Sequence, residues 1–116
     1  MLVVEDNLDA VHMLAMLVRE MGYEADFAIN GHAALDVAKR FRPHVVLLDL
    51  ALPDISGWTV ARQLRRLPEC SGARIYAVTG HYGQAERDRS LAAGCDEHFL
   101  KPLNPASLEK LLAVES

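Results

Sequence analysis

Reactive polar residues stand at the ends of four short apolar runs in this sequence. They are Glu5 and Asp6 after the first run, Asp49 after the second, Thr79 after the third, and Lys101 after the fourth. Three carboxylates held close together repel one another and need a cation to neutralise them. All-oxygen ligands with room for water suit Mg²⁺, and a lysine ammonium with a threonine hydroxyl suits a phosphoryl group. Brought to one place, these residues would support phosphoryl transfer.

The apolar runs themselves have the character of buried strands. The run at 45–48, Val-Val-Leu-Leu, predicts a central strand buried on both faces of a parallel sheet. Shorter runs at 2–4, 75–78 and 98–100 predict three more strands, and the loosely alternating segment 23–29 predicts a strand nearer an edge.

Segments with helical periodicity separate these strands. We expect helices at about 8–21, 31–41, 56–67, 84–93 and from 105 onward. Three of them begin after residues that favour helix starts, namely Asn7, Asn30 and Asn104. Strand and helix therefore alternate five times, which predicts an α/β fold with a doubly wound, five-stranded parallel sheet and five helices. The short crossovers favour the flavodoxin-like strand order 2-1-3-4-5.

In a parallel sheet the carboxyl ends of all strands lie at one edge, so the reactive residues should converge there. Asp49 would lie at the centre, and we assign it the nucleophilic attack that forms an aspartyl phosphate. Taken singly, Glu5 and Asp6 would also suit the positive start of a helix. Thr79 would suit local backbone hydrogen bonding, and Lys101 a surface charge. These separate roles do not explain why all four strand ends carry such residues.

Length and composition limit the class of protein. A chain of 116 residues with 51% hydrophobic and 24% charged residues predicts one globular domain, 1–116. The net charge of −4 argues against direct nucleic-acid binding, which needs a basic surface. No apolar run reaches membrane-spanning length, the first strand leaves no room for a signal peptide, and Cys70 and Cys95 lack metal or redox spacing. We therefore expect a cytoplasmic protein that does not bind membranes.

The set of motifs resembles the receiver domain of bacterial two-component response regulators, and the resemblance covers essentially the whole chain. The matching segments are Val3-Val4-Glu5-Asp6-Asn7, Leu47-Leu48-Asp49 with Pro53 and Gly57, Val78-Thr79-Gly80, and Phe99-Leu100-Lys101-Pro102. The resemblance implies phosphorelay signalling, in which Asp49 accepts a phosphoryl group from the phosphohistidine of a sensor histidine kinase or phosphotransfer protein. Such a chain is a self-phosphorylating acceptor with slow autodephosphorylation, not a turnover enzyme.

The resemblance also implies roles for the individual site residues. Asp6, Asp49 and the backbone carbonyl of Ala51 would hold Mg²⁺, and Glu5 would act through water. The phosphoryl group would be bound by Thr79 and Lys101, whose movement would reshape the face made by the fourth helix, fifth strand and fifth helix. A cis Lys101-Pro102 peptide bond is implied as well.

His98 departs from the family pattern, in which a tyrosine or phenylalanine stands three residues before the lysine. Side chains alternate along a strand, so Phe99 should share a face with Lys101 while His98 points the other way. One hypothesis is that activation draws the imidazole of His98 inward and lowers its pKa. The alternative is that His98 stays exposed in both states.

Other functions fit the sequence less well. A haloacid dehalogenase-type enzyme needs a second acid at the position of Ala51, and a flavin phosphate would be repelled by Glu5 and Asp6. Cys95 and His98 offer only two ligands for zinc. A receiver fold that acts without phosphorylation, or a receiver that belongs to a hybrid histidine kinase, remains open. The sequence identifies neither the kinase nor the downstream protein target.

Overall fold

The computed structural model describes residues 1–80 and 83–115 and contains one five-stranded sheet within them. Its strands are β1 (Leu2–Val4), β2 (Asp26–Ala28), β3 (Val45–Asp49), β4 (Arg74–Thr79) and β5 (Glu97–Leu100). Every pairing is parallel, and the strand order is β2-β1-β3-β4-β5. The predicted doubly wound, flavodoxin-like sheet is thus confirmed.

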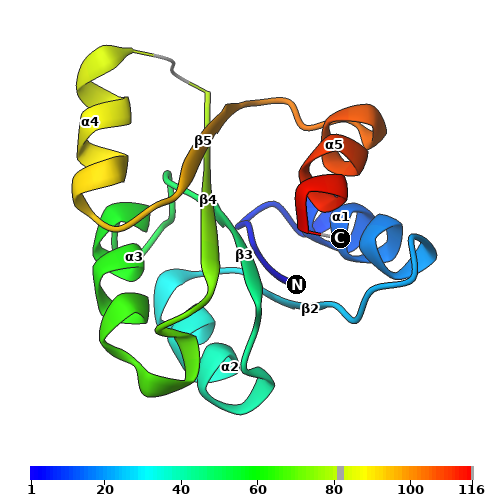
Figure 1. Cartoon of the computed structure of the whole chain (residues 1–116), viewed down its shortest axis with the longest axis horizontal. Coiled ribbons are helices and arrows are strands. Elements are labelled where there is room, and N and C mark those ends of the chain that lie inside the picture. Colours follow the sequence, from blue (N-terminus) through cyan, green and yellow to red (C-terminus); the bar gives the residue numbers. More distant parts are fainter. Residues whose placement is uncertain (81–82, 116) are drawn as a thin grey trace.

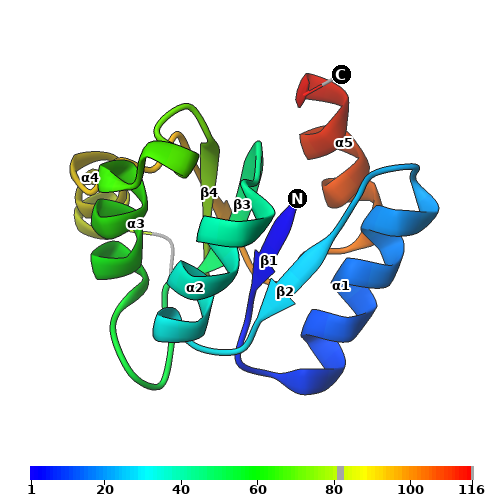
Figure 2. The same ribbon diagram turned by 90° about the horizontal axis from the view of Figure 1, so that it is seen from below.

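The helices connect the strands in the expected alternation. They are α1 (Leu8–Glu20), α2 (Gly31–Phe41), α3 (Gly57–Arg66), the short 3₁₀ helix η1 (Pro68–Cys70), α4 (Gln84–Ala92) and α5 (Pro105–Glu115). Asn7, Asn30 and Asn104 each accept a hydrogen bond from a backbone N–H of the first turn, as the sequence predicted. Figure 2 shows α1 and α5 on one face of the sheet and α2, α3 and α4 on the other.

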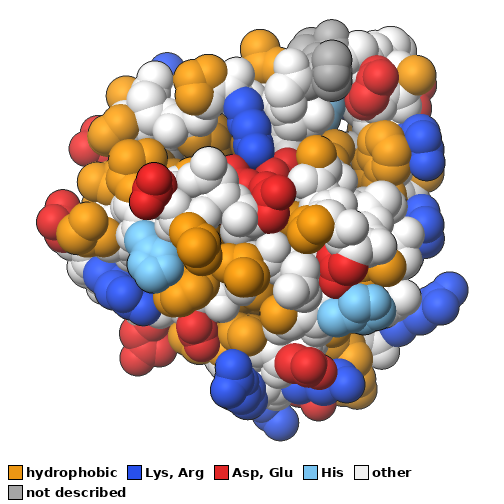
Figure 3. All heavy atoms as spheres, turned by 180° about the vertical axis from the view of Figure 1, so that it is seen from behind, with side chains coloured by type: hydrophobic (Ala, Val, Ile, Leu, Met, Phe, Trp, Pro, Cys, Tyr) orange, Lys and Arg blue, Asp and Glu red, His pale blue; other side chains and the backbone are white. Residues whose placement is uncertain are grey.

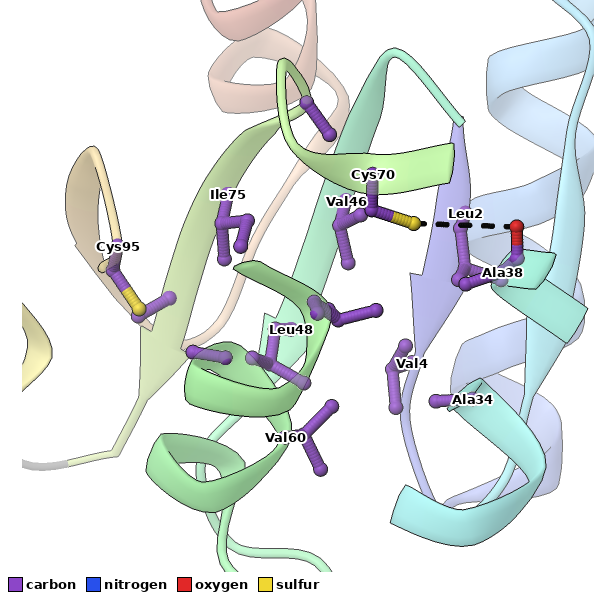
Figure 4. Packing of buried hydrophobic residues seen from close by; sticks show 14 of the residues in the cluster. Leu2, Val4, Ala34, Ala38, Val46, Leu48, Val60, Cys70, Ile75 and Cys95 are labelled. Atoms are coloured by element: carbon purple, nitrogen blue, oxygen red, sulfur yellow. Dashed lines mark hydrogen bonds between the residues drawn. The ribbon is translucent and has the colours of Figure 1, made fainter. Parts of the chain in front are cut away.

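Alternate residues of the strands fill two separate apolar layers. Val46 and Leu48 of β3 face α2 and α3, whereas Val45 and Leu47 face α1 and α5. Figure 4 shows the first layer, in which the thiol-bearing Cys70 and Cys95 pack as apolar residues. A strand buried on both faces holds its end rigidly, which is the property that a reactive residue at that end requires.

The second strand is shorter than the predicted 23–29. Gly22 has a positive φ of 95° and turns the chain after α1. β2 then pairs only with β1, whose three residues offer a ladder of three pairs, from Leu2 with Asp26 to Val4 with Ala28. The length of β1 therefore limits β2. No helix in residues 1–80 or 83–115 combines the length and apolar character needed to cross a membrane.

Helix α4 rests on α3 through a polar contact. Among its described residues only Ser90 is buried, and its hydroxyl accepts a hydrogen bond from Trp58 Nε1 at 2.9 Å while donating to the carbonyl of Glu86 at 3.0 Å. The guanidinium of Arg89 lies 3.7 Å from the centre of the Trp58 ring. With so little apolar burial, α4 is the helix least firmly bound to the sheet.

Candidate functional site

The sheet register brings the reactive strand ends together. Val4 pairs with Leu48, so Glu5 and Asp49 come next along two adjacent strands. On the other side β4 ends at Thr79, and β5 leads into Lys101, whose backbone N–H donates to the carbonyl of Thr79 at 2.8 Å. Figure 1 shows β4 and β5 ending on the same side of the molecule, as parallel strands must.

Lys101 is the centre of the polar contacts at this edge. Its Nζ donates to Asp49 Oδ2 at 2.8 Å and to Glu5 Oε1 at 3.0 Å. Asp49 is 4% exposed and Glu5 is 7% exposed, so both contacts are shielded from bulk water. Burial alone would lower the pKa of Lys101, but the hydrogen bonds that it donates to Asp49 and Glu5 raise the pKa above its ordinary value. Lys101 is therefore a permanent cation at neutral pH.

Glu5, Asp6 and Asp49 form an acidic cluster. Each offers one carboxylate oxygen, and these oxygens lie within 4.8 Å of one another. The hydrogen bond with Glu5 raises the pKa of Asp6, and desolvation and the charge of Glu5 act in the same direction. The cluster thus carries more negative charge than Lys101 neutralises, and it presents the hard oxygen donors that Mg²⁺ prefers. These residues fit a bound Mg²⁺ ion.

Both oxygens of the Asp49 carboxylate are engaged. Oδ2 accepts from Lys101, and Oδ1 accepts from the backbone N–H of Ala51 at 3.0 Å. Thr79 is 9% exposed, and Val78 before it pairs with Asp49 in register. All the residues predicted for the site therefore come to one edge, although their roles in phosphoryl transfer stay predictions.

The peptide bond between Lys101 and Pro102 is cis, which confirms that prediction.

A small apolar cavity of about 180 Å³ lies beside the acids, between α1 and the segment after β5. Met13 and Leu103 line it together with Asp49 and Lys101. Leu8, Met13 and Met16 on α1 are exposed, which places apolar surface directly beside the polar site.

His98 is half-buried, with both ring nitrogens shielded from solvent. Phe99 packs in the layer next to α1 and α5, where its ring contacts Tyr76, so the predicted alternation of His98 and Phe99 is confirmed. Desolvation lowers the pKa of His98, the positive charge of Arg87 on α4 lowers it further, and Glu86 opposes both. In this state His98 is already withdrawn from water, contrary to the alternative in which it stays exposed.

This burial predicts a pH-dependent stability. A histidine whose pKa is depressed by folding contributes stability that is complete above its ordinary value of about 6.5 and is lost as the pH falls through the folded value. The wild type should therefore lose more free energy of unfolding between about pH 7.5 and pH 5 than His98→Phe. Urea unfolding at both pH values measures the difference. His44→Gln, which removes an exposed histidine, should behave like the wild type, and an equal loss in His98→Phe would show that His98 does not contribute.

Asp54, in the loop that follows the acceptor strand, makes a contact that the sequence did not predict. It lies in the loop between β3 and α3, and its carboxylate accepts hydrogen bonds from the backbone N–H groups of Gly31 and His32 on α2. Residues 31 and 54 are distant in the sequence, and no motif connects them. Only the three-dimensional structure shows the contact.

Fold and site together define an α/β protein with an acidic pocket and a positively charged lysine at the carboxyl edge of its sheet. The family model "Response regulator receiver domain" matches residues 1–113, and the chain belongs to this family.

Relatives of known name agree with this membership. The polar-differentiation response regulator DivK of Brucella anthropi is 32% identical over 103 residues, which cover 89% of this chain and 84% of DivK. The signal transduction histidine-protein kinase BarA of Escherichia coli is 27% identical over 109 residues, which cover 94% of this chain but 12% of BarA. The solved structure of the chemotaxis protein CheY4 of Vibrio cholerae superposes with a TM-score of 0.92 at 26% identity, covering 97% of this chain and 94% of CheY4.

Proposed function

We propose that residues 1–116 form a single receiver domain whose Asp49 accepts a phosphoryl group in two-component signalling. The observation that carries this proposal is the buried carboxylate of Asp49 at the end of the central strand, 2.8 Å from the ammonium of Lys101. A buried carboxylate held against a lysine ammonium has a fixed position and few competing contacts with water, which suits a nucleophile.

The phosphodonor is the phosphohistidine of a sensor histidine kinase or of a phosphotransfer protein. A carboxylate oxygen of Asp49 attacks phosphorus, and the bond between phosphorus and the imidazole nitrogen breaks. The electron pair of that bond stays on the ring nitrogen, which takes up a proton from solvent. Lys101 and the hydroxyl of Thr79 then bind the oxygens of the transferred group. The exposed apolar residues of α1 beside the site suit a partner that docks there.

The donor set of the acidic cluster supports a Mg²⁺ ion held by Asp6, Asp49 and the backbone carbonyl of Ala51, with Glu5 acting through water. When bound, Mg²⁺ supplies positive charge that offsets the carboxylates and the phosphoryl oxygens. The chain's own part is to keep three acids within reach of one another while Lys101 prevents their repulsion from opening the site.

The response to phosphorylation is a change in the face formed by α4, β5 and α5. Helix α4 buries little apolar surface and His98 lies under it, so a small shift of Thr79 at the end of β4 can move this face at low cost. The downstream partner is a protein. On the side of the molecule in Figure 3, basic side chains are interspersed with acidic and apolar ones, which does not favour direct nucleic-acid binding. The place of action is the cytoplasm.

A specific observation supports one alternative to this proposal, and another observation argues against a second. The match to BarA over a small part of that kinase supports a receiver that belongs to a hybrid histidine kinase. A receiver fold that works without phosphorylation would need no complete set of acids, threonine and lysine, and this chain has the whole set.

Phosphorylation by a small acyl phosphate tests the proposal directly. The wild type incubated with acetyl phosphate and Mg²⁺ should gain one phosphoryl group per chain, measured by intact-protein mass spectrometry. The same incubation with excess chelator should leave the mass unchanged. Incorporation that does not depend on Mg²⁺ would refute the metal assignment, and no incorporation in either case would favour the phosphorylation-independent alternative.

A further inference from the structure

The loop that follows the acceptor strand is tied to a helix that takes no other part in the site. This loop, residues 50–56, connects β3 to α3 and includes Ala51. Asp54 Oδ1 accepts a hydrogen bond from Gly31 N at 2.8 Å, and Asp54 Oδ2 accepts one from His32 N at 2.9 Å. Both donors belong to the first turn of α2, so one carboxylate joins the loop to the start of that helix.

The backbone N–H groups in the first turn of α2 donate hydrogen bonds to two side chains, one adjacent in the sequence and one distant. Asn30, directly before the helix, accepts a hydrogen bond from the N–H of Ala33 at 2.8 Å. Asp54, which lies in a distant segment of the sequence, accepts hydrogen bonds from the other two N–H groups, those of Gly31 and His32. A carboxylate at this position also meets the positive end of the helix dipole, and such charge-assisted hydrogen bonds are stronger than neutral ones.

The charge of this carboxylate is well maintained. Desolvation works against ionisation of Asp54, but the N–H groups of His32 and Gly31 lower its pKa to about 2. Asp54 therefore accepts both hydrogen bonds at any pH at which the site can work.

Apolar packing reinforces the polar contact. A Cβ atom added to Gly31 would lie 2.4 Å from Cγ1 of Ile55 and 2.8 Å from Cγ2 of Val60. Helix and loop approach so closely that residue 31 has no room for a side chain unless Ile55 moves. The loop is thus seated on α2 by adjacent polar and apolar contacts.

The ends of the loop are held independently. Leu50 N donates to the carbonyl of Val78 at 3.1 Å, and Gly57 N donates to the carbonyl of Leu50 at 3.0 Å. Between these two fixed points Ala51 is exposed, and its N–H donates to Asp49 Oδ1 at 3.0 Å. Leu52 and Ile55 pack against the apolar layer, and Asp54 makes the hydrogen bonds that join the middle of the loop to α2. The direction of the Ala51 carbonyl is therefore set by these attachments together, of which Asp54 supplies the polar one to α2.

We propose that Asp54 is a positioning residue that holds loop 50–56 on α2, so that the Ala51 carbonyl is in place for Mg²⁺ before the ion binds. The inference rests on the proposed function, because Ala51 matters only if its carbonyl is a metal ligand. Ordering the loop in advance removes an entropy cost from metal binding. Mutation of a residue that orients a metal ligand typically lowers the affinity for the metal by 10–100-fold. For Asp54→Ala we expect a loss of Mg²⁺ affinity near the lower limit, about tenfold.

A second capping residue of α2, Asn30, provides a matched control that separates the loss of a helix cap from the release of the loop. Asn30→Ala removes a side-chain cap from the same turn of α2 but leaves loop 50–56 untouched. Asp54→Ala removes a cap and releases the loop. Both variants should lower the melting temperature, and only the second should change the site. Asp54→Asn keeps one acceptor oxygen and should restore part of the difference.

Two measurements decide between a positioning role and a merely structural one. Calorimetric titration with Mg²⁺ alone should give a dissociation constant raised about tenfold in Asp54→Ala, less in Asp54→Asn, and unchanged in Asn30→Ala. Amide hydrogen exchange without metal should become faster at residues 51–55 in Asp54→Ala but not in Asn30→Ala. The same change of Mg²⁺ affinity in Asp54→Ala and Asn30→Ala, or a change below twofold in Asp54→Ala, would overturn the proposal.

The exchange measurement separates this inference from the proposed function. If the wild type binds no Mg²⁺, the metal assignment under the proposed function fails and so does the role toward the Ala51 carbonyl. Faster exchange at 51–55 in Asp54→Ala would then still establish that Asp54 holds the loop. If the wild type binds Mg²⁺ and the loop exchanges at the same rate in both variants, the positioning role is refuted and the proposed function stands.

Discussion

Asp49→Asn is expected to abolish the uptake of a phosphoryl group from acetyl phosphate in the presence of Mg²⁺. An amide oxygen is far less nucleophilic than a carboxylate oxygen, and the Asn side chain has nearly the same size. The substitution therefore removes the reactive group without opening a cavity at the end of β3. Intact-protein mass spectrometry should show no phosphorylated species in Asp49→Asn under conditions in which the wild type is converted.

The control is an aspartate with no place in the site. Asp36 is exposed on α2, and Asp36→Asn removes the same charge elsewhere. It should be phosphorylated like the wild type. Both variants should keep the far-ultraviolet circular dichroism spectrum of the wild type, which would show that the loss of phosphorylation is not caused by unfolding. Phosphorylation of Asp49→Asn at the wild-type level would mean that another residue is the acceptor.

Most of the fold follows from features that are local in the sequence. Four apolar residues in a row can only be buried on both faces, so the central position of β3 was predictable from residues 45–48 alone. Once parallel strands are established, the convergence of Glu5, Asp49 and Lys101 follows from topology, because the carboxyl ends of the strands share one edge.

What the sequence did not predict depends on contacts between distant segments. Asp54 has no local signal of a cap, because the helix it serves begins 23 residues earlier. The burial of His98 under α4 likewise depends on how closely a polar helix approaches an edge strand. The exact length of β2 was set by its partner β1 rather than by its own residues. These are properties of packing, which periodicity does not encode.

The second large effect is expected at Gly57, the first residue of α3. A Cβ atom there would lie 2.6 Å from the Cα of Leu50 and 2.7 Å from the carbonyl oxygen of Asp49. Both are backbone atoms of the segment that carries Asp49. They cannot avoid the added Cβ by a rotamer change, as the end of a flexible side chain could. Gly57→Ala must therefore push α3 away or displace the end of β3. Overpacking of this kind should lower the free energy of unfolding by about 1–3 kcal/mol.

Gly72→Ala is the matched control. A Cβ at Gly72 meets no atom within 4 Å, and the residue is exposed. Its backbone does not have the positive φ that favours glycine. The same added methyl group should therefore leave the stability unchanged or raise it by up to about 1 kcal/mol, because it restricts the unfolded chain. Urea unfolding of both variants measures the contrast.

The rate of phosphorylation shows which part of the Gly57→Ala structure moves. If the end of β3 shifts, the carboxylate of Asp49 leaves its position against Lys101, and a misplacement of about 1 Å reduces the rate of such a reaction by about a hundredfold. If α3 moves instead, the protein loses stability but reacts with acetyl phosphate at the wild-type rate. We expect the second outcome, because Asp49 and Leu50 are buried and Leu50 N is hydrogen-bonded to the carbonyl of Val78, so the end of β3 resists displacement. A rate of phosphorylation about a hundredfold below that of the wild type would show instead that the end of β3 has moved.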